Sequence, residues 1–128
     1  LGAFMVSACL FATLLFHPAS IAETLKLHPL IRRCLMGLAM GSTAMCIVYS
    51  PWGKQSGAHL NPSLTLTYWI LGKVTSVDAI AYAAAHFVGG TSGMGIAIVL
   101  MGNWLADPHV LYVATQPGPA GMLAAVMT

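Results

Sequence analysis

The sequence predicts an all-α membrane protein, and two observations predict it. Apolar residues make up 58% of the 128 residues and charged residues only 6%, whereas a soluble domain carries about 25% charged residues. Five basic and three acidic side chains cannot cover a soluble protein of this size, so most of the surface must face a lipid bilayer. The apolar residues also form long runs without a charge. We therefore expect about three transmembrane helices, one re-entrant half-helix and the start of a fourth span.

The first two spans are expected at residues 1–16 and 33–50. Residues 1–16 hold no charge but fall short of the roughly 20 residues that cross a bilayer, so we expect a first span that lacks its start. Residues 18–30 include two prolines, a glutamate and a lysine, and are expected to form a loop. The second run is expected to stop at Pro51.

The third span, residues 78–101, is the strongest of the three. Its 24 residues extend about 36 Å at ~1.5 Å per residue, enough to cross a bilayer with some tilt. Asp78 lies at its start, where a carboxylate complements the helix dipole. Residues 102–118 hold two prolines and are expected to form a loop, and a fourth helix is expected to begin near Pro119.

Small residues spaced four apart predict faces at which membrane helices pack closely. Gly37 and Gly41 have this spacing in the second span, and Ala85, Gly89 and Gly93 have it in the third. We expect these residues to form helix-packing faces. We also expect the four glycines to seek helices that this chain does not contain.

Composition and spacing exclude several other classes of protein. The net charge is only +2 and the basic residues form no stripe with interleaved aromatic residues, which argues against a nucleic-acid partner. The three cysteines fit no metal spacing, and no two histidines lie three to five residues apart. The sequence offers no nucleophile, no carboxylate pair and no cofactor loop. We therefore expect no catalytic residue, no metal and no cofactor.

The segment between the second and third spans, SGAHLNPSLTLTYWILG at residues 56–72, predicts a helix too short to cross a membrane. Asn61 is a preferred N-cap, Pro62 suits the first helical turn, and Gly72 stops the apolar run. Twelve residues give about 18 Å, against a hydrocarbon core of about 30 Å. Such a helix enters the membrane and stops half-way. Non-helical backbone at that depth, here residues 56–60, survives only beside a water-filled cavity or inside protein, so the segment predicts a pore.

This segment resembles the first signature loop of the aquaporin and glycerol-facilitator family, usually SGAHxNPAxT. The order of the spans is similar as well, and the likeness to bacterial members covers essentially the whole chain. It implies that residues 1–128 are the N-terminal half of an aquaporin-like channel domain, truncated at both ends and without the inverted second repeat. The matching residues are Ser56, Gly57, Ala58, His59, Asn61, Pro62 and Thr65.

The resemblance implies a passive channel for water or small neutral solutes such as glycerol. It also implies a multi-pass homotetramer in the lipid bilayer of the cell membrane. The Asn61 amide is then expected to donate a hydrogen bond to the solute, within a half-helix in which Pro62 and Ser63 also line the pore. By analogy, Met36 is expected to face the narrow filter. Main-chain carbonyls are expected to form a ladder of acceptors at Gly57, Ala58, His59 and Leu60.

Three departures from the family pattern bear on this expectation. Ser63 stands where the family usually has alanine, His86 stands where the third helix usually has glutamine, and the glutamate of the first helix is absent. We expect Ser63 to be tolerated, because its hydroxyl can bond back to a helical carbonyl. We expect His86 to be a packed, neutral, hydrogen-bonded residue, although an ionisable residue inside a span is also a functional candidate.

Two other functions stay open. A membrane structural or assembly subunit would share this composition but would leave the signature segment without solute contact. A small membrane metalloenzyme would need His59 and His86 to converge on a metal.

Overall fold

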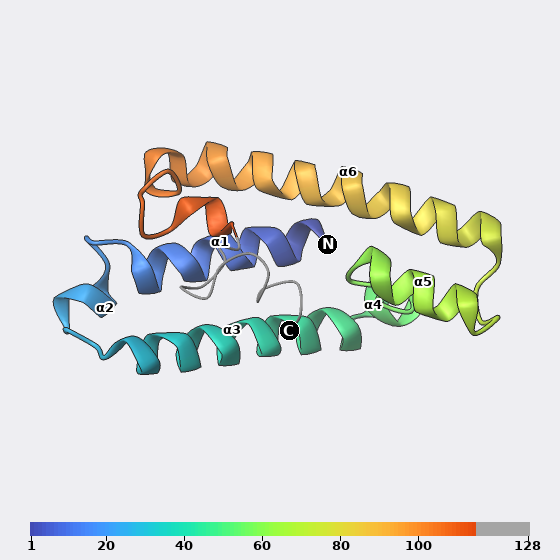
Figure 1. Ribbon diagram of the computed structural model, residues 1–128, viewed down its shortest axis with the longest axis horizontal. Helices are drawn as coiled ribbons and strands as arrows, with labels where there is room; N and C mark the ends of the chain where they lie inside the picture. The colour runs from blue at the N-terminus through green and yellow to red at the C-terminus, as the bar shows by residue number, and fades with distance from the viewer. Residues whose placement is uncertain (115–128) are drawn as a thin grey trace, which may run out of the picture.

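The structure is a computed structural model that describes residues 1–114, and among those residues it contains helices and loops but no strand (Figure 1). This confirms the predicted all-α class. The three predicted spans are present, while the predicted fourth helix lies outside the described residues. The elements in chain order are α1 (Gly2–Phe16), α2 (Ile21–Thr24), α3 (Pro29–Tyr49), α4 (Pro51–Ser56), α5 (Pro62–Ile70), α6 (Ser76–Met101), η1 (Gly102–Trp104) and η2 (Leu111–Val113).

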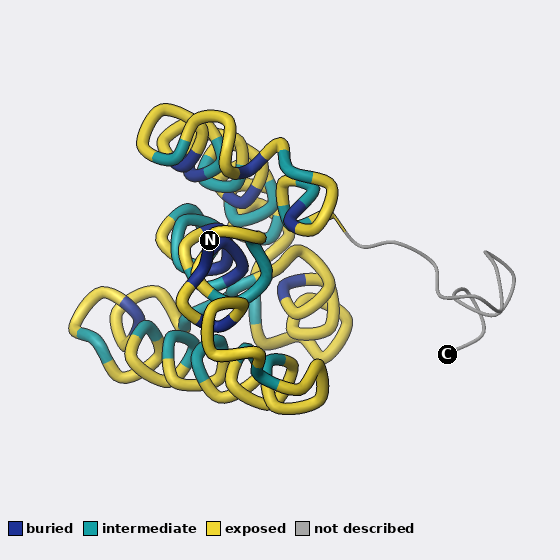
Figure 2. Tube along the Cα trace, turned by 90° about the vertical axis from the view of Figure 1, so that its left-hand side faces the viewer, coloured by how far each residue is buried: buried dark blue, intermediate teal, exposed yellow. Residues whose placement is uncertain are grey.

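Three helical stretches are long and apolar enough to cross a membrane. They are Gly2–Thr24, which includes α1 and α2, Pro29–Tyr49, which is α3, and Ser76–Trp104, which joins α6 to η1. Exposed positions dominate the outer faces of these helices, whereas the buried positions gather around α1 (Figure 2). Large apolar side chains occupy many exposed positions, which suits helices that face lipid. Among the most exposed are Leu38, Ile80, Phe87 and Val99.

Capping side chains place the starts of α3 and α6 earlier than the sequence indicated. α3 begins at Pro29 rather than at residue 33, because the His28 ring accepts a hydrogen bond from the first turn and proline suits the first helical position. α6 begins two residues before Asp78, because Thr75 Oγ1 accepts a hydrogen bond from the Asp78 N–H at 3.2 Å. The expected carboxylate in the first turn of this helix is therefore present.

α1 lies between α3 and α6 and packs against both (Figure 1). Its contact with α6 is close because glycines meet there: a Cβ atom added to Gly93 would lie 2.5 Å from the carbonyl oxygen of Gly2. Gly89 lies beside the same residue. These two glycines pack against a helix of this chain, so the expectation that they seek helices outside it was wrong. Further along the contact, a buried apolar cluster consists of Cys9, Ala12, Ala97, Leu105 and Val110.

The other predicted packing residues make no such contact in residues 1–114. No residue of α3 is buried, and a Cβ atom added to Gly37 or Gly41 would meet no atom within 4 Å. Ala85 is exposed among the described residues. Close packing at Gly37, Gly41 and Ala85 stays a prediction about other helices.

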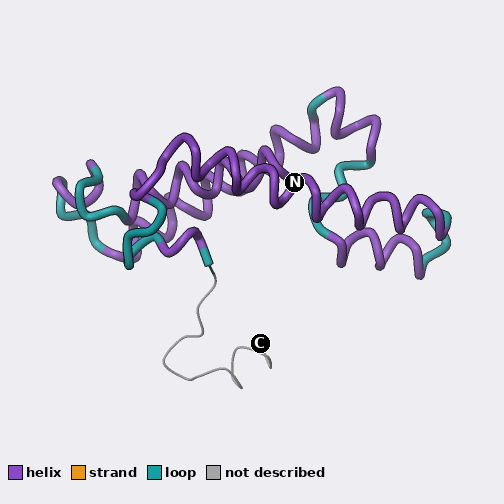
Figure 3. Tube along the Cα trace, turned by 90° about the horizontal axis from the view of Figure 1, so that it is seen from above, coloured by secondary structure: helices purple, strands orange, loops and turns teal. Residues whose placement is uncertain are grey.

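A short helix, α2, lies within residues 18–30, where the sequence predicted only a loop (Figure 3). Ser20 Oγ caps it by accepting a hydrogen bond from the Glu23 N–H at 3.2 Å. The Glu23 carboxylate lies 2.6 Å from the guanidinium of Arg32 and so ties α2 to the first turns of α3.

The end of α1 and the segment after α6 lie together at one end of the bundle. The His17 ring stacks on Trp104 with ring centroids 5.0 Å apart. His17 Nδ1 accepts a hydrogen bond from the Ala19 N–H, so the proton on Nε2 faces the Asp107 carboxylate at 3.9 Å. That carboxylate also accepts hydrogen bonds from the N–H and the ring of His109, at 2.8 and 2.9 Å. The bond from the His109 N–H lowers the pKa of Asp107 below its ordinary value.

This lowered pKa predicts a pH-dependent contribution of Asp107 to stability. The unfolded chain binds the proton more tightly than the folded protein, so the contribution is full above the ordinary pKa and is lost as pH falls through the lower, folded value. We expect Asp107→Asn to lower the melting temperature of the complete protein in detergent near neutral pH. The difference should shrink as pH falls below about 4. Circular dichroism melts of both proteins measure it, and a difference unchanged at about pH 3 contradicts the prediction.

Candidate functional site

The stretch before the candidate site contains a helix that the sequence did not predict. Pro51 ends α3 as expected, but it also begins α4, because Ser50 Oγ accepts a hydrogen bond from the Gly53 N–H at 3.0 Å. Proline suits the first helical position, since the N–H that it lacks would have no partner there. Residues 51–56 are therefore helical, and the non-helical segment covers residues 57–61 rather than the expected residues 56–60.

The signature loop, defined here as residues 57–61, joins α4 to α5. Gly57 ends α4 with φ +72°, and Ala58 follows with φ +48°. Glycine adopts this left-handed conformation freely, whereas alanine does so at roughly 1–2 kcal/mol. Two successive left-handed residues turn the chain back, so α5 starts inside the bundle rather than at its end.

Hydrogen bonds from α6 hold the signature loop well inside the bundle. Tyr82 Oη donates to the Ser56 carbonyl at 2.8 Å, and His86 Nε2 donates to the His59 carbonyl. His86 lies ten residues from the start of α6, about 15 Å along a helix of 26 residues and roughly 39 Å. The loop thus reaches toward the middle of a membrane-length helix, and α5 leads back toward the end of the bundle where α6 begins (Figure 1).

α5 is a half-helix in length and is shorter than expected. It has nine residues, about 13.5 Å, rather than twelve. Its hydrogen bonding ends at Leu71, and Gly72 follows in a left-handed conformation with φ +67°. A helix of this length cannot cross a hydrocarbon core of about 30 Å.

Asn61 is the N-cap of α5. Its backbone is extended, and its Oδ1 accepts a hydrogen bond from the Leu64 N–H at 2.8 Å. Pro62 occupies the first helical position. The cap uses the oxygen of the Asn61 amide and fixes the orientation of the group, while the amide nitrogen has no acceptor among the described residues. A side-chain donor is therefore available at the positive end of a helix.

The His59 ring is held by three neighbouring side chains. Its Nδ1 lies 3.1 Å from Oγ1 of the buried Thr65. The ring also stacks on Tyr68 with centroids 5.0 Å apart, and it packs at an angle on Tyr82 at 4.7 Å. His59 is thus fixed both through its ring and through its carbonyl, which bonds to α6.

An open groove of about 650 Å³ lies between α1, α3 and the signature loop. The loop contributes Ala58, His59 and Leu60 to its wall. The hydroxyls of Ser7 and Thr43 donate to carbonyls of their own helices, which leaves their oxygens able to accept from a solute. The lining residues from the two long helices include Ser7, Phe11, Ala39, Ser42, Thr43 and Cys46.

Other predicted pore residues do not line this groove. Gly57 and Asn61 lie outside its lining, although Asn61 follows directly on Leu60. Met36 packs against the buried apolar cluster around α1, so the structure does not bring it to the signature loop. A role for Met36 in a filter stays a prediction.

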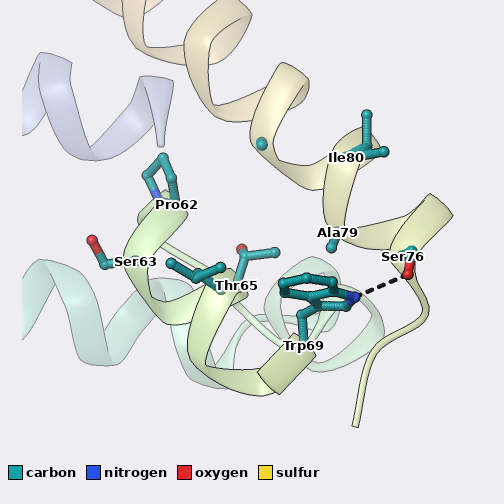
Figure 4. A pocket seen from close by; sticks show the side chains of 9 residues that line it. Pro62, Ser63, Thr65, Trp69, Ser76, Ala79 and Ile80 are labelled. Atoms are coloured by element: carbon teal, nitrogen blue, oxygen red, sulfur yellow. Dashed lines mark hydrogen bonds between the residues drawn. The ribbon is translucent and has the colours of Figure 1, made fainter. Parts of the chain in front are cut away.

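Pro62 and Ser63 line a second, mostly apolar groove of about 500 Å³ between α5 and α6 (Figure 4). Trp69 lies across this groove and donates a hydrogen bond from Nε1 to Ser76 Oγ at 3.0 Å. Ser63 is therefore part of the wall of this groove and not of the groove that the signature loop lines.

The His59 carbonyl, one of the four acceptors of the expected ladder, already has a partner within the protein. It accepts from His86 Nε2 and turns toward α6, because that helix supplies a buried donor at the same depth. Because a carbonyl oxygen has two lone pairs, solute contact at Gly57, Ala58, His59 and Leu60 stays a prediction.

The two histidines of the metalloenzyme alternative are engaged in other interactions. His86 Nε2 bonds to a main-chain carbonyl, and His59 Nδ1 pairs with Thr65. Within residues 1–114, no three His, Cys, Asp or Glu side chains are grouped as metal ligands. This arrangement gives the metalloenzyme reading no support.

Sequence reasoning missed the groove residues of α1 and α3. The available signal was weak: Ser7, Ser42 and Thr43 are small hydroxyl residues within otherwise apolar runs. Such residues often only bond back to their own helix, as Ser7 and Thr43 do. Their common wall appears only once the helices are packed.

Three apolar spans and a half-helix that turns back inside the bundle define a multi-pass membrane protein. Residues 3–126 match the major intrinsic protein family, and the chain belongs to that family. The resemblance seen in the sequence is thereby confirmed.

Comparison with individual relatives supports the same family assignment. The chain is 32% identical to aquaporin-5 of Mus musculus over an alignment of 131 positions, which covers 96% of this chain and 48% of the relative. It is 30% identical to the probable aquaporin AqpM of Archaeoglobus fulgidus over 94 residues, 73% of this chain and 37% of the relative. For aquaporin Z of Photorhabdus laumondii the identity is 31% over 83 residues, 65% of this chain and 33% of the relative. The chain spans about half the length of the first of these relatives, and the matches to the other two cover a smaller share of their length. No solved structure matches it.

Proposed function

We propose that the protein to which this chain belongs is a passive membrane channel for water or small neutral solutes such as glycerol, with Asn61 at its pore. The observation that supports this most is the state of the Asn61 side chain. Its oxygen is used by the cap of α5, and its nitrogen has no acceptor within residues 1–114, so it can donate to a solute. The donor belongs to a re-entrant segment that α6 holds near the middle of its own length.

The groove beside the signature loop supplies the other half of the proposed mechanism. A water or hydroxyl oxygen accepts from the Asn61 amide, and its hydrogens are donated to loop carbonyls or to hydroxyls such as that of Thr43. A neutral molecule exchanges its water contacts for these at little cost. An ion loses a hydration shell that such a wall does not replace, at tens of kcal/mol in a simple Born estimate. The positive end of α5 adds to the exclusion of cations.

A complete pore needs a second re-entrant helix from the opposite face of the membrane. α5 is about 13.5 Å long and serves less than half of a core of about 30 Å. We infer that an inverted repeat outside these residues provides the second half-helix, consistent with relatives about twice as long as this chain. We also propose that the complete protein is a homotetramer. The unoccupied face at Gly37 and Gly41 is suited to close contact with another helix.

Thiol modification tests this proposal, because Cys46 lines the groove while Cys34, also exposed and on α3, does not. The complete protein is reconstituted in vesicles as a Cys34→Ser or a Cys46→Ser variant. Any cysteines outside residues 1–128 are replaced in both variants. A methanethiosulfonate reagent should lower osmotic water flux severalfold in Cys34→Ser, which keeps the groove thiol. Flux in Cys46→Ser should not change. A reducing agent should restore the lost flux.

Two results would count against the proposal. Equal inhibition of both variants would show that the groove is not the path. An absence of flux from correctly assembled wild-type protein would favour the structural or assembly subunit instead.

A further inference from the structure

We propose that Tyr82 and His86 of α6 are positioning residues, which hold the signature loop at the depth where Asn61 meets the solute. This rests on the proposed channel function. The two residues lie four apart and therefore share one face of α6. Tyr82 Oη donates to the Ser56 carbonyl at 2.8 Å, just before the loop, and His86 Nε2 donates to the His59 carbonyl within it.

These hydrogen bonds bear on the position of the loop because helical bonding cannot fix it. Gly57 and Ala58 are left-handed and interrupt the pattern between α4 and α5. Carbonyls in such a segment need partners at membrane depth, since lipid offers none. Tyr82 also packs on the His59 ring, so one side chain contacts the last residue of α4 through its hydroxyl and the loop through its ring.

The ring nitrogen of His86 that carries the proton determines which side chains could replace this residue. A carbonyl only accepts hydrogen bonds, so Nε2 carries the proton that reaches His59. In the neutral ring Nδ1 is then an acceptor, and it has no partner among the described residues. The residue is only 5% exposed, so water cannot readily replace the bond to His59 if it is broken. Position 86 therefore requires a hydrogen-bond donor that extends as far from the backbone as Nε2 of histidine.

Glutamine and asparagine distinguish this requirement from simple packing. The amide nitrogen of glutamine extends about as far from the backbone as Nε2 of histidine, whereas that of asparagine ends near the position of Nδ1. A positioning role through Nε2 predicts that His86→Gln retains function and His86→Asn does not. Tyr82→Phe removes only the hydroxyl and keeps the ring that packs on His59. Tyr49→Phe is a matched control, because Tyr49 is 66% exposed on α3.

The experiment uses the complete protein reconstituted in vesicles and compares osmotic water flux per molecule across these four variants. His86→Asn and Tyr82→Phe should each lower flux about two- to tenfold, the range expected for one lost neutral hydrogen bond. His86→Gln and Tyr49→Phe should stay close to wild type. Hydrogen–deuterium exchange of residues 57–61 provides a second readout, and exchange should accelerate in His86→Asn and Tyr82→Phe but not in His86→Gln.

The exchange readout does not depend on conduction, so it separates this inference from the proposed function. If the wild-type protein conducts no water but the loop still exchanges faster in the two variants, the positioning role is upheld and the proposed channel function is rejected. Wild-type exchange and flux in both Tyr82→Phe and His86→Asn would overturn the inference. Equal losses in His86→Gln and His86→Asn would also overturn it, because the position would then require histidine for another reason.

Discussion

Replacing Asn61 with aspartate should abolish most of the flux through the proposed channel. Aspartate caps helices about as well as asparagine, so α5 should still begin at Pro62. The amide donor, however, is replaced by an oxygen that is either anionic or protonated. A charged group near the membrane centre costs roughly 2.5–3.5 kcal/mol on insertion scales. Because about 1.4 kcal/mol corresponds to a factor of ten, flux per molecule should fall by more than about tenfold.

Stopped-flow osmotic swelling of vesicles with matched protein content measures this effect. The chain contains two asparagines, and the other, Asn103, is exposed in η1 far from the signature loop along the sequence. Asn103→Asp introduces the same change in charge and should leave flux near wild type. Normal assembly together with normal flux in Asn61→Asp would show that Asn61 does not line the pore.

Replacing Gly93 with alanine should lower the stability of the protein, because it forces a methyl group into the contact between α1 and α6. The new Cβ atom would lie 2.5 Å from the Gly2 carbonyl oxygen and 2.7 Å from its Cα atom. Backbone atoms cannot rotate away, so α1 must move off α6 and loosen the buried cluster around Cys9 and Ala97. Overpacking of this kind costs about 1–3 kcal/mol.

Gly95 provides a control in the same helix, because a Cβ atom there would meet nothing within 4 Å among the described residues. Alanine is the better helix former by up to about 1 kcal/mol, so Gly95→Ala should be neutral or stabilising. The melting temperature of the complete protein in detergent should therefore fall for Gly93→Ala and should stay unchanged or rise for Gly95→Ala. Equal shifts of the same sign would mean that α1 and α6 do not meet at these glycines.

Features that depend on neighbouring residues could be predicted from the sequence. The three spans follow from charge-free runs, and the cap of α5 follows from Asn61 and Pro62, because capping involves only the next few residues. The extra helix α4 shows a limit of the same reasoning. Pro51 indicates a helix end and a helix start equally well, and only the Ser50 cap decides between them.

Features that depend on packing could not be predicted in this way. His86 and the carbonyl it bonds are 27 residues apart, and no local pattern indicates that bond. The spacing of small residues four apart indicated which faces could pack closely. It did not show that Gly93 contacts α1 while Gly37 contacts no other described helix. Met36 illustrates the same point, since its contact with the cluster around α1 depends on how three helices assemble.

The groove beside the signature loop is open along one side, and this has a consequence for biosynthesis. In a bilayer, an uncovered trough with apolar walls takes up acyl chains, and a file of water enters only after protein has closed the gap. Conduction should therefore begin in one step when the last wall is in place, rather than grow as each helix inserts.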